Sequence, residues 1–86
     1  MVHIAEIENE LLLFIRTSVL DSGVSIEKDT AFRQLGIDSL SIIAIVLFIE
    51  RKFGVRLPEE ELVPENLGSV NAVAACCVRL LSATKS

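Results

Sequence analysis

The sequence predicts a small all-α bundle with three longer helices, one short helix and a long loop between the first two helices. Apolar residues recur at three- and four-residue steps in separate segments, and no segment shows the two-residue alternation of a half-buried strand. Residues that start or stop helices, namely Asp38, Gly54 and Ser69, stand at the ends of these segments. With 86 residues, the chain is expected to form one domain over residues 1–86.

The first helix is expected over about residues 3–19, because its apolar residues share one helical face. This face holds Ile4, Ile7, Leu11, Phe14 and Ile15, whereas Glu6, Glu8, Asn9, Glu10 and Arg16 occupy the other faces. The loop over residues 21–38 is longer than the usual helix connection, which suggests a functional role. Phe32 and Leu35 are three residues apart and are expected to anchor the loop through one helical turn.

The second helix is expected from Ser39 to about Phe53, where Gly54 suits a left-handed stop. Pro58 and Pro64 each fit the first position of a short helical turn. The last helix is expected to follow the N-cap residue Ser69 and to run to about residue 81. Its apolar stripe consists of Val70, Val73, Ala74, Cys77 and Leu81.

The composition excludes several classes of function. The net charge of −4 argues against a nucleic-acid partner, which would require clustered Lys and Arg, and makes basic partners the better electrostatic match. The longest apolar run, residues 42–49, is far shorter than the roughly 20 residues of a membrane-spanning helix, so no stable membrane insertion is expected. The first ten residues carry acids where a signal peptide would carry bases, which indicates a cytoplasmic protein.

Cys76 and Cys77 are adjacent, a spacing that suits neither a disulfide framework nor a tetrahedral metal site. We therefore expect no bound metal and interpret both cysteines as small buried core residues.

The junction GIDSL, residues 36–40, has the features of a well-capped helix start. Gly36 permits a positive φ and hence a sharp turn out of the loop. The Asp38 carboxylate can accept hydrogen bonds from first-turn N–H groups. Ile37 and Ile42 have the spacing of a hydrophobic staple. On local physics alone, the junction needs no other explanation than helix capping.

Ser39 is not explained by capping, because the cap places its hydroxyl at the first, exposed helical position. A phosphate ester there would meet the free N–H groups and the positive end of the helix dipole. A catalytic role is disfavoured, since the sole histidine, His3, lies at a terminus and is expected to be solvated. Ser41, the other first-turn hydroxyl, faces about 200° away from Ser39.

The run DTAFRQLGIDSLSIIAIVLFIERKFGVRLPEEEL, followed by PENLGSVNAVAA, resembles an acyl carrier protein or a peptidyl carrier protein. The hallmark of these carriers is an L-G-x-D-S-L segment before the second helix, and the resemblance covers nearly the whole chain. It implies a four-helix bundle of the acyl-carrier type. It also implies that a phosphopantetheinyl transferase esterifies Ser39 with 4′-phosphopantetheine from coenzyme A. The thiol of that arm would hold acyl or aminoacyl cargo as a thioester, so the protein itself is expected not to be an enzyme.

The resemblance also assigns roles to the neighbours of Ser39. Asp38 matches the preceding aspartate of the family, a helix cap and a contact for the transferase. Leu40 matches a leucine that is partly exposed at partner interfaces in relatives. Carriers of bacterial fatty acid synthesis usually have acids directly after DSL and again within the helix, where this chain has Ser41 and Ala44. Those carriers dock on basic patches, so that mode of recognition is in doubt for this chain.

The second helix has more apolar residues than one inward stripe can bury. If Ile45, Val46, Ile49 and Phe53 face inward, some of Ile42, Ile43, Leu47 and Phe48 must remain near the surface. One interpretation is a partner-binding face, whose candidate residues are Leu40, Ile43, Ala44, Leu47, Glu60 and Glu61. The alternatives are that the third helix and the loop cover the apolar residues and that Glu59, Glu60 and Glu61 only solvate a helix start.

We therefore predict a freestanding acyl carrier protein of a specialised lipid or polyketide-type pathway, distinct from the housekeeping carrier of fatty acid biosynthesis. The alternatives are an aminoacyl or peptidyl carrier of a nonribosomal-peptide-type system and an unmodified helical adaptor that retains the carrier fold. The expected partners are the phosphopantetheinyl transferase, a loading ligase or acyltransferase, and a ketosynthase, with the carrier acting as a monomer. A core of branched aliphatic residues could open to take in an acyl chain, which suits an acyl carrier better than a peptidyl carrier.

Overall fold

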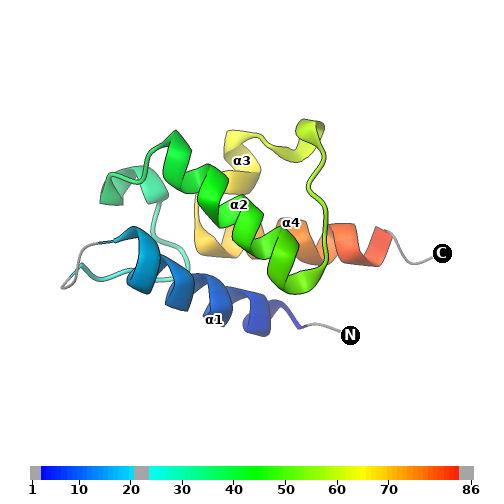
Figure 1. Cartoon of the computed structure of the whole chain (residues 1–86), viewed down its shortest axis with the longest axis horizontal. Coiled ribbons are helices and arrows are strands. Elements are labelled where there is room, and N and C mark those ends of the chain that lie inside the picture. The colour runs from blue at the N-terminus through cyan, green and yellow to red at the C-terminus, as the bar shows by residue number, and fades with distance from the viewer. Residues whose placement is uncertain (1–2, 21–23, 84–86) are drawn as a thin grey trace.

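The structure, a computed structural model, describes residues 3–20 and 24–83, and within these ranges the chain forms helices and no strand (Figure 1). The longer helices are α1 (Ile4–Phe14), α2 (Ser39–Phe53) and α4 (Val70–Ala83), and α3 (Pro64–Leu67) is short. A π-helical turn, η1 (Ile15–Val19), continues α1, and the 3₁₀ turns η2 (Phe32–Leu35) and η3 (Glu59–Glu61) lie in the connections. The predicted all-α bundle and the boundaries of the second helix are confirmed.

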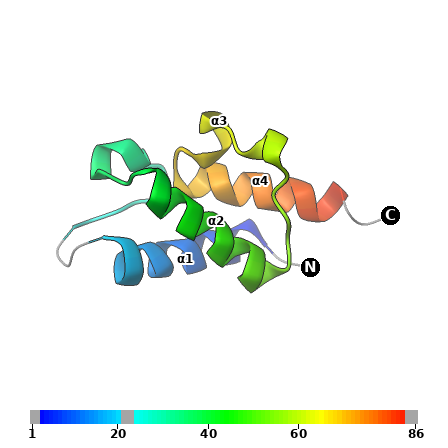
Figure 2. The ribbon, with the colours of Figure 1, turned by 45° about the horizontal axis from the view of Figure 1, so that its top comes forward.

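The helices enclose one apolar core. α1 packs against both α4 and α2, and α3 packs against α4, while the turn η2 lies toward one end of the bundle (Figures 1 and 2). The fully buried residues come from α1, η1, α2 and α4 and are Ile7, Leu11, Ile15, Ile45, Ile49, Val70, Ala74, Cys76 and Cys77. None of the helices within the described ranges combines the length and the apolar character that a membrane span requires.

Cys76 and Cys77 are free thiols inside this core, as predicted. Burial raises the pKa of both thiols, and that of Cys77 to about 12. Both side chains are therefore protonated at neutral pH and act as packing residues. Within the described residues, no group of three or more potential ligand side chains could hold a metal ion.

Two residues of α1 differ from the predicted amphipathic pattern. Ile4, assigned to the apolar face, is 41% exposed, because it lies in the first turn of the helix at the edge of the bundle. Glu8, assigned to a polar face, is buried, and its carboxylate pairs with the Lys28 ammonium at 3.3 Å. The long loop thus supplies a cation that allows an acid to be buried on α1. His3 is exposed as predicted, and its N–H donates to the Glu6 carboxylate at 3.4 Å.

The long loop is anchored to the segment that begins α4. The Phe32 N–H donates to the Gly68 carbonyl at 2.8 Å, and the Asn71 N–H donates to the Lys28 carbonyl at 2.9 Å. The Phe32 ring is buried in the core, and Leu35 is half-buried. The prediction that this turn anchors the loop is confirmed, and the anchor fixes the chain just before α2.

The caps and turns after α2 largely follow the predictions. Gly54 ends α2 with a left-handed φ of 66°, and Pro64 occupies the first position of α3. Ser69 caps α4, since its hydroxyl oxygen accepts a hydrogen bond from the Ala72 N–H at 3.3 Å. Pro58 differs from the prediction, because it is the N-cap residue of η3, in an extended conformation, and not its first helical residue.

Candidate functional site

The chain enters α2 through a sharp turn at Gly36. This glycine has a left-handed φ of 73° and ends η2, and its N–H donates to the Arg33 carbonyl at 3.3 Å. The next residue, Ile37, is buried, and its N–H donates to the Phe32 carbonyl at 3.2 Å. The anchored turn η2 therefore sets the position at which α2 begins.

Asp38 is the N-cap of α2, as predicted. Its Oδ1 accepts a hydrogen bond from the Ser41 N–H at 2.9 Å, and its carbonyl oxygen accepts from the Ile42 N–H at 3.0 Å. The backbone N–H of Ser41, followed by the Ser41 hydroxyl, lowers the pKa of Asp38 below its ordinary value of 3.8. Asp38 is therefore a carboxylate at neutral pH, close to the positive end of the helix dipole.

Ser39 and Ser41 differ in the availability of their hydroxyl groups. Ser39 is the first residue of α2, its side chain is exposed, and its hydroxyl makes no hydrogen bond within the described residues. Ser41 is half-buried, and both its N–H and its hydroxyl interact with the Asp38 carboxylate. The hydroxyl that is free for covalent chemistry at this junction is that of Ser39.

A large cavity of about 820 Å³ opens beside Ser39, between α2 and the segment that contains α3. The α2 wall includes Ile42 and Val46, and the opposite wall includes Leu62 and Leu67. Ser39 itself lies on the rim, so a group attached to its hydroxyl would start at the edge of this apolar space. We call it the α2–α3 cavity.

Glu50 is one of the charged residues on the wall of the α2–α3 cavity. Its carboxylate accepts a hydrogen bond from the Leu57 N–H at 2.9 Å, although seven residues separate the two. The bond holds the chain that leaves α2 against the end of the helix. Leu57 lines the cavity, so the position of this part of the wall depends on the Glu50 carboxylate.

Apolar side chains remain on the outside of α2, as predicted. Leu40 is 77% exposed, Ile43 54% and Leu47 48%, and we call these three residues with Ala44 the outer face of α2. The alternative, that the third helix and the loop cover the surplus apolar residues of α2, is wrong for Ile43 and Leu47. Ile42 and Phe48 are half-buried and pack against the core. Ala44 is half-buried and lines a second hollow of about 410 Å³, the α1–α2 recess.

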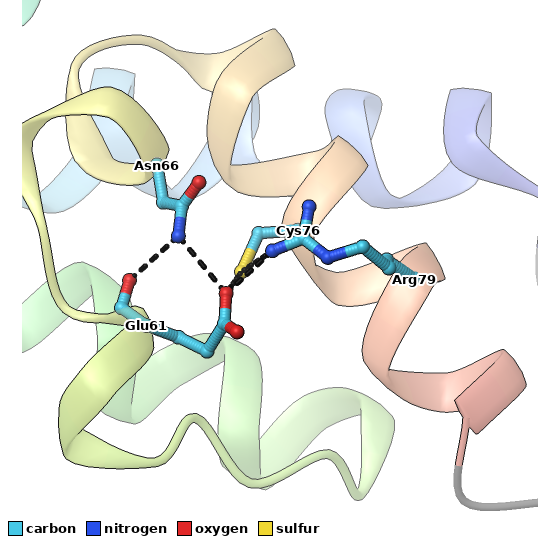
Figure 3. A network of polar contacts seen from close by, with 4 residues as sticks. All are labelled: Glu61, Asn66, Cys76 and Arg79. Carbon is cyan, nitrogen blue, oxygen red and sulfur yellow. Dashed lines mark hydrogen bonds and ion pairs between the residues drawn. The ribbon is translucent and has the colours of Figure 1, made fainter.

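Glu60 and Glu61, two further candidates for partner binding, have different surroundings. Glu60 is exposed. The Glu61 carboxylate accepts hydrogen bonds from the Asn66 amide at 3.0 Å and from the Arg79 guanidinium, and the Cys76 thiol lies 3.7 Å away (Figure 3). Glu61 thus ties η3 to α3 and α4, a structural role that the sequence reasoning missed. A role in partner binding remains a prediction for both Glu60 and Glu61.

Comparisons with known proteins agree with this geometry. The family model described as "Phosphopantetheine attachment site" matches residues 12–77, more than half of the chain. The chain is 40% identical over 67 residues to an acyl carrier protein of Arthrobacter sp. (strain FB24), and this match covers 78% of the chain and 73% of that relative. It is 58% identical over 31 residues to the anthracycline acyl carrier protein DauA of Streptomyces sp. (strain C5), which covers 36% of the chain and only 37% of that relative.

The fold has a counterpart among solved structures. The crystal structure of an acyl carrier protein from Thermotoga maritima superposes with a TM-score of 0.73 at 20% identity, covering 93% of this chain and 92% of that one. The residues at the start of α2 fit a covalent phosphopantetheine group, because a free serine hydroxyl stands at a helix N-terminus beside an apolar cavity. The chain therefore belongs to the phosphopantetheine attachment site family and is related to acyl carrier proteins, and the cofactor of this family is 4′-phosphopantetheine.

Proposed function

We propose that Ser39 carries the 4′-phosphopantetheine arm and that this chain delivers acyl intermediates, held as thioesters, to partner enzymes. The observation that carries the proposal is the free, exposed hydroxyl of Ser39 at the start of α2, on the rim of the α2–α3 cavity. Ser41 is the less suitable acceptor because it is half-buried and its N–H is hydrogen-bonded to the Asp38 carboxylate. The arm supplies a terminal thiol on which the cargo is held.

The neighbouring residues have separate tasks in this proposal. Asp38 holds the first turn of α2 so that Ser39 keeps its exposed position, and it also offers a carboxylate to the phosphopantetheinyl transferase. Leu40 is the most exposed large apolar residue described and is the first contact for the transferase and later partners. Tethering raises the effective concentration of the cargo at each partner enzyme and prevents its loss by diffusion.

The test is the intact mass of the protein after incubation with coenzyme A and a broad-specificity phosphopantetheinyl transferase. The wild-type chain and Ser41→Ala should each gain one phosphopantetheinyl group, whereas Ser39→Ala should gain none. A gain that survives Ser39→Ala would identify another acceptor. No gain in any form, under conditions that modify a known carrier, would indicate an unmodified adaptor.

We also propose that the pathway is a specialised lipid or polyketide-type pathway. The only acid of α2 is Glu50, whose carboxylate is bonded to the Leu57 N–H, and the outer face of α2 is apolar. Such a face differs from the acidic helix of housekeeping carriers. One relative of the chain is described as an anthracycline acyl carrier protein, which is consistent with a specialised pathway. Efficient charging by the malonyl transferase and elongation by the ketosynthase of housekeeping fatty acid synthesis would contradict this pathway assignment.

The α2–α3 cavity supports an acyl cargo over an aminoacyl cargo. Its walls are mostly apolar, and each methylene sheltered from water contributes about 0.8 kcal/mol. An aminoacyl group would bring a charged ammonium into this apolar space, which is unfavourable. The cargo is therefore proposed to be an acyl chain that enters the cavity from Ser39.

A further inference from the structure

A stripe of exposed residues along α2 ends in a positive charge. Leu40, Ile43, Leu47 and Arg51 follow one another at steps of three or four residues, so they lie on one side of the helix. The three apolar members are each about half exposed or more, and Arg51 is also exposed. The outer face of α2 therefore continues into a guanidinium group one turn beyond Leu47.

The α1–α2 recess lies beside this stripe. It is lined by Phe14 of α1 and by Ala44, Leu47, Phe48, Arg51 and Lys52 of α2. The rings of Phe14 and Phe48 stack with their centroids 4.3 Å apart and their planes 11° apart, which gives the recess a rigid apolar wall. Its volume of about 410 Å³ has room for a large apolar side chain, and two basic groups lie at its edge.

The positive charge at this edge is only partly balanced within the protein. The Lys52 ammonium lies 3.8 Å from the Glu10 carboxylate, but Arg51 has no ion-pair partner among the described residues. Glu50, the only acid of α2, lines the other cavity and bonds to Leu57. The local charge beside the outer face is thus positive, although the chain as a whole carries −4.

The α1–α2 recess is separate from the space beside Ser39. Leu47 is the one residue that lines both the recess and the α2–α3 cavity, and Ser39 lines only the latter. A cargo that enters from Ser39 would therefore occupy the α2–α3 cavity, and the recess stays available to another molecule. Its basic edge suits an acidic occupant, because opposite charges at the rim of an interface steer association and fix the register.

We propose that α2 docks a carrier-dependent partner enzyme that places an apolar side chain in the α1–α2 recess and a carboxylate against Arg51. The inference rests on the carrier function proposed above and specifies the chemistry of its partner. It reverses the expectation, drawn from the net charge alone, that basic partners are the better match. Arg51 is in this account a specificity-determining residue, because it selects partners by the charge next to their apolar contact.

The test uses a ketosynthase whose carrier-entry surface has Lys and Arg side chains, together with a variant in which these residues are changed to Glu. Each is cross-linked to the modified carrier through a reactive group on the arm, and the rates are compared at low salt. The acidic ketosynthase should react faster, and Arg51→Glu should shift the ratio of the two rates about 10-fold toward the basic form. Added salt should reduce both preferences.

The matched control is Arg16→Glu, which makes the same change of net charge at an exposed arginine that lines neither cavity. It should leave the ratio of rates unchanged. Equal effects of Arg51→Glu and Arg16→Glu, or no effect of Arg51→Glu, would overturn the proposal. The mass gain of each variant is verified first. Titration of both ketosynthases with the unmodified carrier should then show the same preference as a ratio of affinities, without the arm. A failure of Ser39 loading is thereby distinguishable from a failure of docking.

Two other occupants of the recess would also overturn the proposal. A dimer that sedimentation detects in the wild type and that Leu47→Glu abolishes would show that a second copy fills the recess. Amide shifts at Ala44 and Phe48 after loading with a long acyl chain, without shifts along the α2–α3 cavity, would show that the chain's own cargo fills it. The proposal predicts a monomer and unchanged Ala44 and Phe48 resonances.

Discussion

The Asp38 carboxylate interacts with both the N–H and the hydroxyl of Ser41, and its hydrogen bond to the N–H measures 2.9 Å. Asp38 thus caps α2 and also interacts with Ser41, the other first-turn serine that could accept the phosphopantetheine group. Because the cap is made by residue 38 and not by residue 39, the Ser39 hydroxyl has no structural task. Because Asp38 makes the cap, Ser39 is left available as the proposed attachment residue.

The first prediction concerns the pH dependence of this cap. The pKa of Asp38 is lowered from 3.8 in the folded protein, so its contribution to stability is complete above 3.8 and is lost as the pH falls through the folded pKa. Asp38→Asn keeps a capping side chain but has no charge to titrate. The difference in urea midpoint between the wild type and Asp38→Asn should therefore be constant near neutral pH and shrink below pH 3.8. A difference that grows on acidification would contradict the cap.

The second prediction concerns the turn at Gly36. An added Cβ at this residue would meet no atom within 4 Å, so a substitution tests only the left-handed φ of 73°. Gly36→Ala should lower the free energy of unfolding by roughly 1 kcal/mol, and Gly36→Asn by less, because asparagine tolerates this conformation better. Urea unfolding measures both variants. An alanine variant as stable as the wild type would show that residue 36 does not need the left-handed conformation.

The third prediction concerns the contacts of Glu61. Glu61→Ala removes the acceptor of the Asn66 amide and of Arg79, and should lower the free energy of unfolding by about 1 kcal/mol. Arg79→Ala should cost less, because its side chain is 55% exposed and the ion pair is screened by water. The matched control is Glu60→Ala, an exposed neighbour that should change stability by less than about 0.5 kcal/mol. Equal losses at Glu60 and Glu61 would refute the structural role of Glu61.

The fourth prediction concerns the cargo. Loading Ser39 with a long acyl chain should shift the amide resonances of Val46 and Leu67, which lie on opposite walls of the α2–α3 cavity. Leu62→Phe should reduce these shifts by filling the rim of the cavity, whereas Leu13→Phe, an exposed position outside it, should not. Shifts confined to Ser39 and its sequence neighbours would mean that the cargo stays outside the bundle.

The parts of the fold that depend on neighbours in sequence were predictable. Asp38, Gly54 and Ser69 set helix ends through hydrogen bonds or dihedral angles within a few residues, so their residue types alone carry the information. The cap likewise predicts the exposed first-turn position of Ser39, whereas the role of Leu40 was expected only from the resemblance to carrier proteins. The free hydroxyl and the exposed leucine are both consequences of local geometry.

The parts that depend on tertiary packing were not predictable. Lys28 meets Glu8, and Arg79 meets Glu61, across long stretches of chain whose approach is decided by the packing of the loop and of α4. The α1–α2 recess likewise requires the contact between Phe14 and Phe48. From the sequence, Arg51 has no distinguishing feature beyond a cation near a helix end, and only the recess beside it suggests a role in partner choice.

Attachment of the arm to Ser39 can be tested by isolating the protein from its native cells, digesting it and locating any modification by fragment mass spectrometry. We expect a phosphopantetheinyl group on Ser39, with an acyl thioester at the tip of the arm in a fraction of the molecules. A protein that is unmodified at Ser39, or that carries the group on Ser41, would show that Ser39 is not the attachment residue.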